Sequence, residues 1–305
     1  MIVLSYVGKL PSYIVECVYQ IRLFFSGEVY LIVDDLQSPF LVSLNAIVIP
    51  YTPVPDFSEL VERNIHKFII DDKLGDRKEL FIRSFERFFL LHRAMIERDL
   101  SNVIFLEIDV LIYHDPSYWV AEFSQHELCY TFDNVNRCSG AFMYVQSADS
   151  ISGLIDFMMD YINNKPIRTG LETLDEMTCL YHYYKKNPTI VELLPVYWED
   201  RTVHPEACMN YSKYERIFDS LSIGCNMIGG MSIDEHGNPC VEKKSLRWSS
   251  VDYSKCRFQF MKDQEDRKIP HIWNESENAW TAIQNLHVHS KELSKGLSFY
   301  PPAHK

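Results

Sequence analysis

Two carboxylates stand two residues apart inside an otherwise apolar run of the sequence. Glu107 and Asp109 interrupt residues 102–113, NVIFLEIDVLIY, which otherwise has the composition of a buried strand. Burying an unpaired charge costs several kcal/mol, so each carboxylate needs a partner or a position at the strand's end. Along one strand this spacing places both side chains on the same face, where they suit a hard divalent cation. The alternative is that one carboxylate caps a helix and the other pairs with an arginine.

A second segment that could do chemistry lies near the carboxyl end, where residues 285–291 read NLHVHSK. His287 and His289 alternate, so on a strand they would share a face and could reach a metal ion. Ser290 and Lys291 follow directly and could hold phosphate. The alternative is a pair of surface or hydrogen-bonded histidines beside a basic tail. The two segments together are more specific than either alone, because a diphosphate-bound cation needs carboxylate, imidazole and ammonium partners that converge.

The elements that must position these groups begin with an alternation of strand and helix patterns. Three strand-like runs alternate with two helical ones, at residues 1–7, 11–25, 29–33, 38–45 and 46–50. This rhythm with short connections predicts a parallel sheet with helices on its faces. Ligands bind such sheets beyond the carboxyl ends of the strands, where Asp34 and Asp35 would lie.

The rest of the chain continues with mixed patterns and then becomes irregular. Further helices are predicted at residues 56–68, 79–98, 151–163 and 173–186, and further strands at 127–132, 141–145, 189–195 and 286–290. From about residue 205 the pattern is irregular up to the last strand. Residues 218–224 together with Gly229 and Gly230 are interpreted as a loop that could close over a donor or acceptor, with a simple turn as the alternative for the two glycines. With no repeat, low-complexity tract or linker, the sequence favours a single domain.

Composition excludes some functions. The formal net charge of −12 argues against a nucleic-acid binder, because phosphate backbones are held by clustered Lys and Arg. A nucleotide ligand is still compatible, since a metal ion can supply positive charge. The eight cysteines are scattered without metal-ligand spacing, which favours reduced thiols in a cytoplasmic protein. Neither a signal peptide nor an apolar run long enough for a membrane span is recognisable.

Four segments occur in the order and spacing of a known family. Residues 84–91 (SFERFFLL), 103–113 (VIFLEIDVLIY), 136–145 (NRCSGAFMYV) and 287–293 (HVHSKEL) resemble GT-A glycosyltransferases across most of the chain. In that fold a DxD-type motif binds the metal, an N/S-G turn follows on a later strand, and a C-terminal histidine completes the metal site. Here Glu107 replaces the first Asp, and HxHSK stands where related families often carry one His with a more distant Lys.

The resemblance implies a GT-A-like, Rossmann-like α/β fold whose mostly parallel central sheet is flanked by helices. Residues 1–115 would bind the nucleotide and residues 116–305 would form the acceptor side. The implied metal ligands are Asp109, Glu107, His287 and His289, with Asp109 the safest assignment and the ligating histidine undecided. The cation would be Mn²⁺ rather than Mg²⁺.

The same resemblance assigns residues to the donor, a UDP- or GDP-linked sugar. The implied donor-binding residues are Ser5, Tyr6 and Val7 at the base and ribose, Asp34 or Asp35 at the same nucleotide, Arg87 at the sugar or phosphates, and Asn136, Ser139 and Gly140 at the sugar. For Arg87 the alternative is a surface arginine paired with Glu86 or Asp99. For Asn136 the alternative is a plain turn residue. Ser290 and Lys291 would hold phosphate.

The acceptor, a glycan or a lipid- or protein-linked sugar, attacks as a hydroxyl. Loss of a nucleoside diphosphate builds charge on its β-phosphate, which the cation and Lys291 would stabilise. An inverting route needs a carboxylate base, and Glu172, Asp175 and Glu176 cluster near a probable helix start, with Asp175 the preferred candidate. Carboxylates there also simply complement the helix dipole. A retaining route needs no such base, and both routes stay open.

Three other functions fit parts of the pattern. A sugar nucleotidyltransferase would carry a Gly-rich, basic loop after the first strand, whereas this chain has VGKLPSY. A non-catalytic sugar- or nucleotide-binding protein on a GT-A scaffold would not need both the Glu107–Asp109 pair and the HVHSK segment. A zinc enzyme built on the histidines finds no support in the cysteine spacing.

Overall fold

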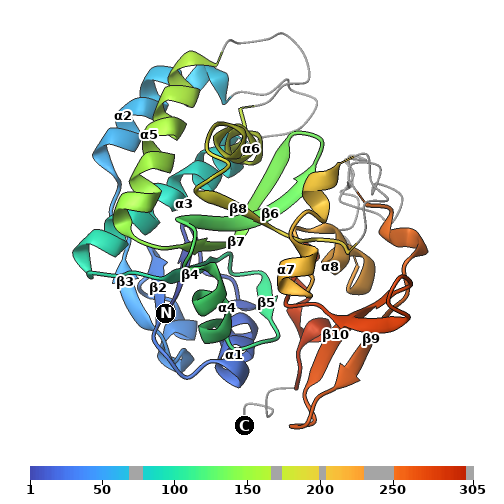
Figure 1. Ribbon diagram of the computed structural model, residues 1–305. Coiled ribbons are helices and arrows are strands. Elements are labelled where there is room, and N and C mark those ends of the chain that lie inside the picture. Colours follow the sequence, from blue (N-terminus) through green and yellow to red (C-terminus); the bar gives the residue numbers. More distant parts are fainter. Residues whose placement is uncertain (69–77, 166–173, 199–203, 230–250, 300–305) are drawn as a thin grey trace, which may run out of the picture.

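The computed structural model describes residues 1–68, 78–165, 174–198, 204–229 and 251–299. The main sheet has seven strands in the spatial order β3-β2-β1-β4-β7-β6-β8 (Figure 1). These strands are β1 (Ile2–Tyr6), β2 (Val29–Val33), β3 (Ile47–Pro50), β4 (Val103–Leu106), β6 (Leu128–Asn134), β7 (Arg137–Val145) and β8 (Val191–Leu194). Among them only β7 is antiparallel to its neighbours. The predicted α/β class with a mostly parallel central sheet is therefore confirmed.

Helices cover both faces of this sheet. They are α1 (Ile14–Phe24), α2 (Pro55–Asn64), α3 (Lys78–Glu97), α4 (Pro116–Phe123), α5 (Ala148–Asn164) and α6 (Glu176–Lys186), followed by the short α7 (Tyr211–Tyr214) and α8 (Ser222–Met227). Helices α2, α3, α5 and α6 pack together on one face, and α1 and α4 lie on the other (Figure 1). Because β2 and β4 are covered on both faces, every one of their residues is buried. Strands in such positions must be apolar along their whole length.

Short 3-10 helices join several of these elements. They occupy Pro39–Ser43, Ile65–Lys67, Pro205–Ala207, Tyr253–Lys255 and Leu293–Gly296. The helix predicted at residues 38–45 is the first of them. In the part of the chain that the structure describes, no helix is both long and apolar enough to cross a lipid bilayer.

The apolar run at residues 102–113 is two strands, which corrects the prediction of one. After β4 the chain turns, with the amide of Val110 donating to the carbonyl of Glu107 at 3.1 Å. It then continues as β5 (Val110–Ile112), which leaves the main sheet and pairs antiparallel with β12 (Asn285–His287). Glu107 and Asp109 therefore lie in a turn at the carboxyl end of β4. Because of this position, neither carboxylate lies in the interior of the main sheet, where a continuous strand would have buried both.

The carboxyl ends of three parallel strands meet at one edge of the sheet. Strands β1, β2 and β4 run in the same direction, so the residues after each of them share that edge. The predicted ligand residues 5–7, 34–35 and 107–109 come at or directly after these ends. The topology thus gathers segments that lie far apart in the sequence.

The irregular carboxyl-terminal region contains a sheet that the sequence did not predict. Strands β9 (Phe258–Lys262), β10 (Lys268–Asn274) and β11 (Ala279–Ala282) form an antiparallel meander (Figure 1). Most of β9 is exposed and most of β11 is only partly buried, so neither strand has the apolar run by which the buried strands were found. The last strand, β12, is also shorter than predicted and ends at His287.

Candidate active site

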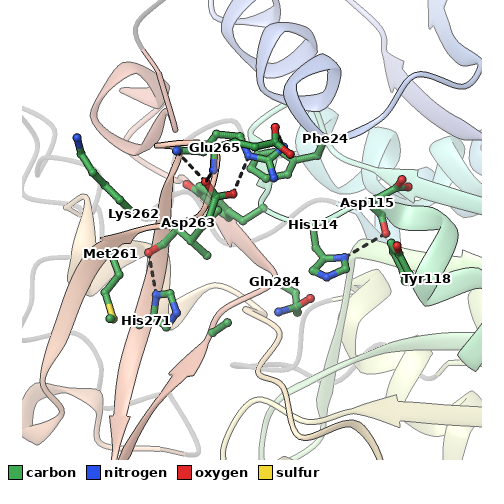
Figure 2. Close-up of a pocket in the computed structure, with 14 residues that line it drawn as sticks. Phe24, His114, Asp115, Tyr118, Met261, Lys262, Asp263, Glu265, His271 and Gln284 are labelled. Carbon is green, nitrogen blue, oxygen red and sulfur yellow. Dashed lines mark hydrogen bonds and ion pairs between the residues drawn. The ribbon is translucent and has the colours of Figure 1, made fainter.

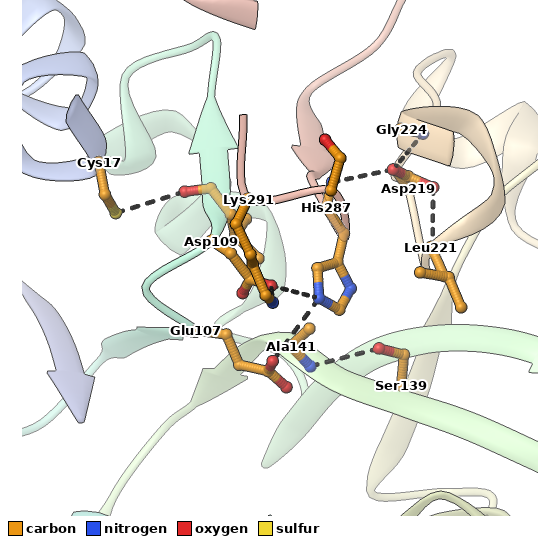
Figure 3. A network of polar contacts seen from close by, with 12 residues as sticks. Cys17, Glu107, Asp109, Ser139, Ala141, Asp219, Leu221, Gly224, His287 and Lys291 are labelled. Carbon is orange, nitrogen blue, oxygen red and sulfur yellow. Dashed lines mark hydrogen bonds and ion pairs between the residues drawn. The ribbon is translucent and has the colours of Figure 1, made fainter. Parts of the chain in front are cut away.

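The carboxylate and histidine segments converge as the sequence predicted. Asp109, His287 and His289 each offer a ligand atom, and these atoms lie within 4.8 Å of one another. The Nε2 atom of His287 is 3.4 Å from Asp109 Oδ2 and 3.6 Å from Glu107 Oε2 (Figure 3). Their elements are joined directly, because the amide of Val288 donates to the carbonyl of Asp109 at 2.9 Å. His289 lies in the turn after β12 rather than on the strand, with its ring centroid 4.4 Å from that of His287.

The cluster concentrates charge in a partly buried site, where Asp109 is 2% exposed and the side chain of Glu107 is 28% exposed. Burial alone would raise the pKa of Glu107, but Arg87 and His287 outweigh burial and lower it to about 2. Burial opposes ionisation of Asp109 as well, and His287 and Lys291 hold its pKa well below the ordinary value. Both carboxylates are therefore ionised at neutral pH and need cationic partners. Burial and the neighbouring His287 lower the pKa of His289 to about 3, so this imidazole is neutral.

The donor atoms fit a divalent cation. Nδ1 of His287 lies 3.1 Å from the carbonyl oxygen of Ser220, which can only accept, so Nδ1 carries a proton. The other ring nitrogen, Nε2, is buried and has no hydrogen-bond partner among the residues that the structure describes. Burial opposes protonation of His287, but Asp109 and Glu107 raise its pKa well above the ordinary value, so Nε2 also carries a proton. A cation bound beside the carboxylates would take the place of that proton, with the ring held through Nδ1. Carboxylate oxygens suit Mg²⁺, Ca²⁺ and Mn²⁺, and imidazole nitrogens suit transition metals, so the donor set is compatible with several divalent cations.

Lys291 completes the cluster from a tight turn. Its Nζ forms an ion pair with Asp109 Oδ2. Its amide donates to the carbonyl of Val288 at 2.9 Å, and its backbone φ of +61° lies in the left-handed region. Such conformations persist where the surroundings enforce them, often at functional sites. Ser290 helps to shape this turn, because its Oγ accepts from the amide of Glu292 at 3.3 Å.

Asp219 organises the site and was missed by the sequence analysis. Its carboxylate accepts the amide of His287 at 2.9 Å, in addition to the amides of Leu221, Ile223 and Gly224 (Figure 3). A Cβ at Gly224 would come within 2.2 Å of the carbonyl oxygen of His287, so this position requires glycine. Asp219 is 1% exposed. Residues 222–227 form α8 rather than part of a loop, and Asp219 joins this helix to β12. Closure of this segment over a ligand stays a prediction.

Replacing Asp219 by asparagine is expected to weaken Mn²⁺ binding about 10- to 100-fold, as loss of a group that orients a metal ligand usually does. The amide NH2 would face backbone N–H groups that now meet an anionic acceptor, and His287 would shift. Mn²⁺ titration followed by electron paramagnetic resonance measures the effect, with folding checked by circular dichroism. The exposed Asp160→Asn on α5 is the control. Wild-type affinity in a folded Asp219→Asn protein would contradict the assigned role.

The residues predicted to line the nucleotide lie at the expected sheet edge. Ser5, Tyr6 and Val7 are half-buried at the end of β1. Asp34 and Asp35 have a structural task there, because Asp34 Oδ1 accepts the amide of Gly8 at 2.8 Å and Asp35 Oδ2 that of Leu10 at 3.1 Å. These bonds fix the loop after β1, and contact with a nucleotide stays a prediction.

Tyr13 is a further neighbour of the cluster that the sequence analysis did not single out. It precedes α1 and is half-buried. Burial raises the pKa of its phenol, and the charges of Asp109 and Glu107 raise it further. The phenol is therefore a permanent hydrogen-bond donor beside the acidic cluster. Because tyrosines are frequent in this chain, only the fold distinguishes this one.

Arg87 reaches the cluster through Glu107. Its side chain is 12% exposed and forms ion pairs with Glu107 and, at 3.2 Å, with Glu176. The alternative partner considered above, Glu86, instead binds Tyr51 and Arg83. Arg87 is thus a largely buried cation that orients Glu107, and within the described part of the chain its Nε has no hydrogen-bond partner. Contact with a donor sugar or phosphate stays a prediction.

The three residues predicted to border the donor sugar all belong to the β6–β7 hairpin, one at its tip and two farther along β7. Asn136 lies in the exposed turn that joins the two strands. Ser139 is buried, and its Oγ accepts the amide of Ala141 at 3.3 Å. A Cβ at Gly140 would lie 2.7 Å from the ring of Phe88, so glycine is needed here for packing against α3. In the described residues no hydrogen bond joins these three to the acidic cluster.

The proposed base region has clear local functions. Asp175 is the N-cap of α6, with Oδ1 accepting the amide of Thr178 at 2.9 Å, and lies 3.7 Å from Arg137. Glu176 begins α6 and is buried against Arg87; burial raises its pKa. Glu172 lies outside the described residues. Catalysis by any of the three stays a prediction.

Asp133 is a buried carboxylate that the sequence analysis overlooked. It lies on β6, is 5% exposed and accepts from Ser220 Oγ at 3.3 Å and from Asn134 Nδ2 at 2.8 Å. Burial raises its pKa to about 6, even though Arg137 and the bond from Ser220 act in the opposite direction. A carboxylate that titrates near neutral pH beside the metal cluster has the properties of a general acid or base.

Known proteins resemble this chain in structure and not in sequence. No protein-family model matches the chain, and no curated protein sequence matches it. Among solved structures, apo mouse xyloside xylosyltransferase 1 aligns with 9% identity and a TM-score of 0.44, covering 64% of this chain and 84% of that one. The PaToxG glycosyltransferase aligns with 12% identity and a TM-score of 0.39 over 61% and 69%. The glycosyltransferase GlyE of Streptococcus pneumoniae TIGR4 has the same identity and TM-score over 70% and 49%.

These likenesses are too distant to carry an argument about function. The groups that can do chemistry in this chain are those of the acidic cluster and its neighbours.

Proposed function

We propose that this chain is a metal-dependent glycosyltransferase that moves a sugar from a nucleoside-diphosphate sugar to a hydroxyl group of an acceptor. The observation that carries the proposal is the convergence of Glu107 and Asp109 with two histidines and Lys291. This convergence occurs at the edge where ligands of parallel sheets bind. Residues 1–115 would bind the nucleotide and residues 116–305 would shape the acceptor side, within a single GT-A-like domain.

The residues divide the work of the reaction among them. Asp109, Glu107 and His287 would hold the cation, with His289 beside them. When bound, such a cation neutralises charge that develops on the departing diphosphate. Lys291, now paired with Asp109, would donate to a phosphate oxygen whose charge increases as the sugar leaves. Asp133 would accept the proton of the acceptor hydroxyl on an inverting route.

Donor and acceptor belong to the same proposal at a coarser level. A UDP- or GDP-linked sugar is the expected donor, with Mn²⁺ preferred to Mg²⁺, and a glycan or a lipid- or protein-linked sugar is the expected acceptor. The half-buried Tyr6 at the end of β1 offers a flat ring of the kind that stacks on a nucleotide base. The negative net charge of the chain is compatible with such a donor only if a cation accompanies the diphosphate.

The test is a binding and hydrolysis screen of nucleotide sugars. UDP-glucose, UDP-galactose, UDP-xylose, UDP-N-acetylglucosamine, GDP-mannose and GDP-fucose are each offered with Mn²⁺, with Mg²⁺ and with EDTA. We expect one donor to bind and to be hydrolysed slowly with Mn²⁺ and not with EDTA. Absence of any metal-dependent binding would refute the proposal. Pyrophosphate release from UTP and a sugar 1-phosphate would instead identify a nucleotidyltransferase.

A further inference from the structure

A cavity of about 580 Å³ lies away from the acidic cluster, between the β9–β10 hairpin and the segment that joins β5 to α4 (Figure 2). None of the candidate metal ligands lines it. Strand β5 separates the two sites, since Asp109 precedes it and Tyr113 follows it. Four residues of strand correspond to about 13 Å. The cavity is thus a second site, at the other end of β5.

Aromatic and apolar surface is exposed at the cavity. Tyr118, in the first turn of α4, is 61% exposed, and its ring packs edge-on against His114 at 5.2 Å. Met261 approaches from β9 and is 36% exposed. Figure 2 shows His114 and Tyr118 on one side of the cavity and Met261 with His271 on the other. An exposed tyrosine ring offers a flat apolar face with a polar edge, which suits the C–H face of a sugar ring.

Both cations of the described lining are paired with carboxylates, and the further carboxylate, Asp115, accepts the amide of Ser117 at 2.9 Å. Arg267 pairs with Asp263 at 2.7 Å and with Glu265 at 3.2 Å, and its Nη1 donates to the carbonyl of Leu23 at 2.9 Å. Lys262 pairs with Asp266 at 2.6 Å. Burial lowers the pKa of His271, so that ring is neutral. Because each Lys and Arg of the described lining has an anionic partner, the cavity does not favour a phosphate or a carboxylate ligand.

Neutral hydrogen-bonding groups line the cavity. The Oε1 atom of Gln284 accepts from Trp119 Nε1 at 3.0 Å, so the amide NH2 is oriented and has no bond of its own among the described residues. His271 and His114 each contact a carbonyl oxygen through Nδ1, at 2.9 and 3.3 Å. The neutral ring of His271, protonated at Nδ1, presents Nε2 as an acceptor. Donors and acceptors without charge match hydroxyl groups, which both donate and accept.

We propose that this cavity binds a neutral oligosaccharide at a site separate from the acidic cluster. The sugar ring would stack on Tyr118, and its hydroxyls would bond to Gln284, His114 and His271. This binding needs neither a cation nor a nucleotide, so it does not depend on the proposed transferase activity. If the chain does transfer sugars, the cavity would hold a distal part of a glycan.

The test uses saturation-transfer difference NMR with lactose, maltotriose, xylotriose, mannotriose and chitotriose, all in EDTA without nucleotide. At least one trisaccharide or lactose is expected to bind, and pyrophosphate is not expected to compete. Tyr118→Ala is expected to weaken that binding at least about tenfold. Tyr19→Ala, a half-buried tyrosine on α1 outside the cavity, is the matched control and should bind normally.

Two outcomes would overturn the inference. The first is that none of the five sugars binds in EDTA. The second is that binding survives in Tyr118→Ala but disappears in Asp109→Asn, which would place the sugar at the acidic cluster. Neither outcome decides the donor screen, because that screen measures metal-dependent nucleotide binding. The two proposals therefore fail independently.

Discussion

Replacing Asp109 by asparagine is expected to lower kcat/KM for donor hydrolysis on the order of 1000-fold, the cost typical of losing one strong electrostatic group at a reacting centre. The substitution keeps the size of the side chain and removes its charge. Lys291 would lose its anionic partner, and His287 would lose the nearer of its two carboxylates. Mn²⁺ affinity should fall as well, because a neutral amide oxygen is a weaker ligand for a hard cation.

The comparison with Glu107→Gln makes this prediction sharper. Glu107 already neutralises Arg87 through Oε1, so its share in holding a cation is expected to be smaller than that of Asp109. We expect Mn²⁺ affinity to decline in the order wild type, Glu107→Gln, Asp109→Asn, as measured by electron paramagnetic resonance. Asp156→Asn, on the exposed side of α5, is the control. Undiminished metal-dependent hydrolysis by Asp109→Asn would remove the basis of the proposed function.

The site could be predicted from the sequence to the extent that its chemistry is local. Carboxylates inside an apolar run and histidines beside a lysine are recognisable because burying such groups is costly without a function or a partner. The two segments were predicted to converge because their groups together suit a bound cation, and the structure brings them together. The stated geometry was wrong, since Glu107 and Asp109 lie in a turn and His289 lies beyond the strand. In the sequence, two carboxylates separated by one residue look the same whether they lie in a strand or in a turn that follows a strand.

Residues that act through distant backbone groups could not be predicted. The carboxylate of Asp219 binds the amide of His287, 68 positions away, and no periodicity records such a contact. Asp133 resembles any strand residue until the fold shows that Ser220 and Arg137 surround it. The antiparallel meander was not predicted from the sequence for a related reason. Its stability comes from pairing between partly exposed strands and not from an apolar run.

Asp133→Asn is expected to lose activity and to gain stability at neutral pH. Burial raises the pKa of Asp133 in the folded state to about 6, above its ordinary value of 3.8. The folded protein therefore binds this proton more tightly than the unfolded chain does. Above pH 6 ionisation of the buried carboxylate disfavours folding, by at most about 3 kcal/mol, and the penalty disappears as the pH falls toward 4. The variant's advantage in melting temperature should shrink over the same range.

The same substitution is also expected to change turnover and its dependence on pH. As the base, Asp133 must be ionised, so wild-type turnover should fall as the pH drops below about 6. The groups facing Asp133 are Asn134, Arg137, Asp219, Ser220 and His287, and the substitution leaves each of them in the sequence. Asp133→Asn is expected to reduce turnover at pH 7.5 about 100-fold or more and to remove the acidic limb from the residual activity.

Asp175→Asn is the matched comparison, because it tests the competing base with little structural cost. Asparagine caps a helix about as well as aspartate, so the start of α6 should be retained. If Asp133 is the base, Asp175→Asn keeps most activity and keeps the acidic limb. If Asp175→Asn loses turnover while Asp133→Asn keeps it, the proton is accepted at the start of α6. Loss in neither variant favours a retaining route, which requires no protein base for the acceptor.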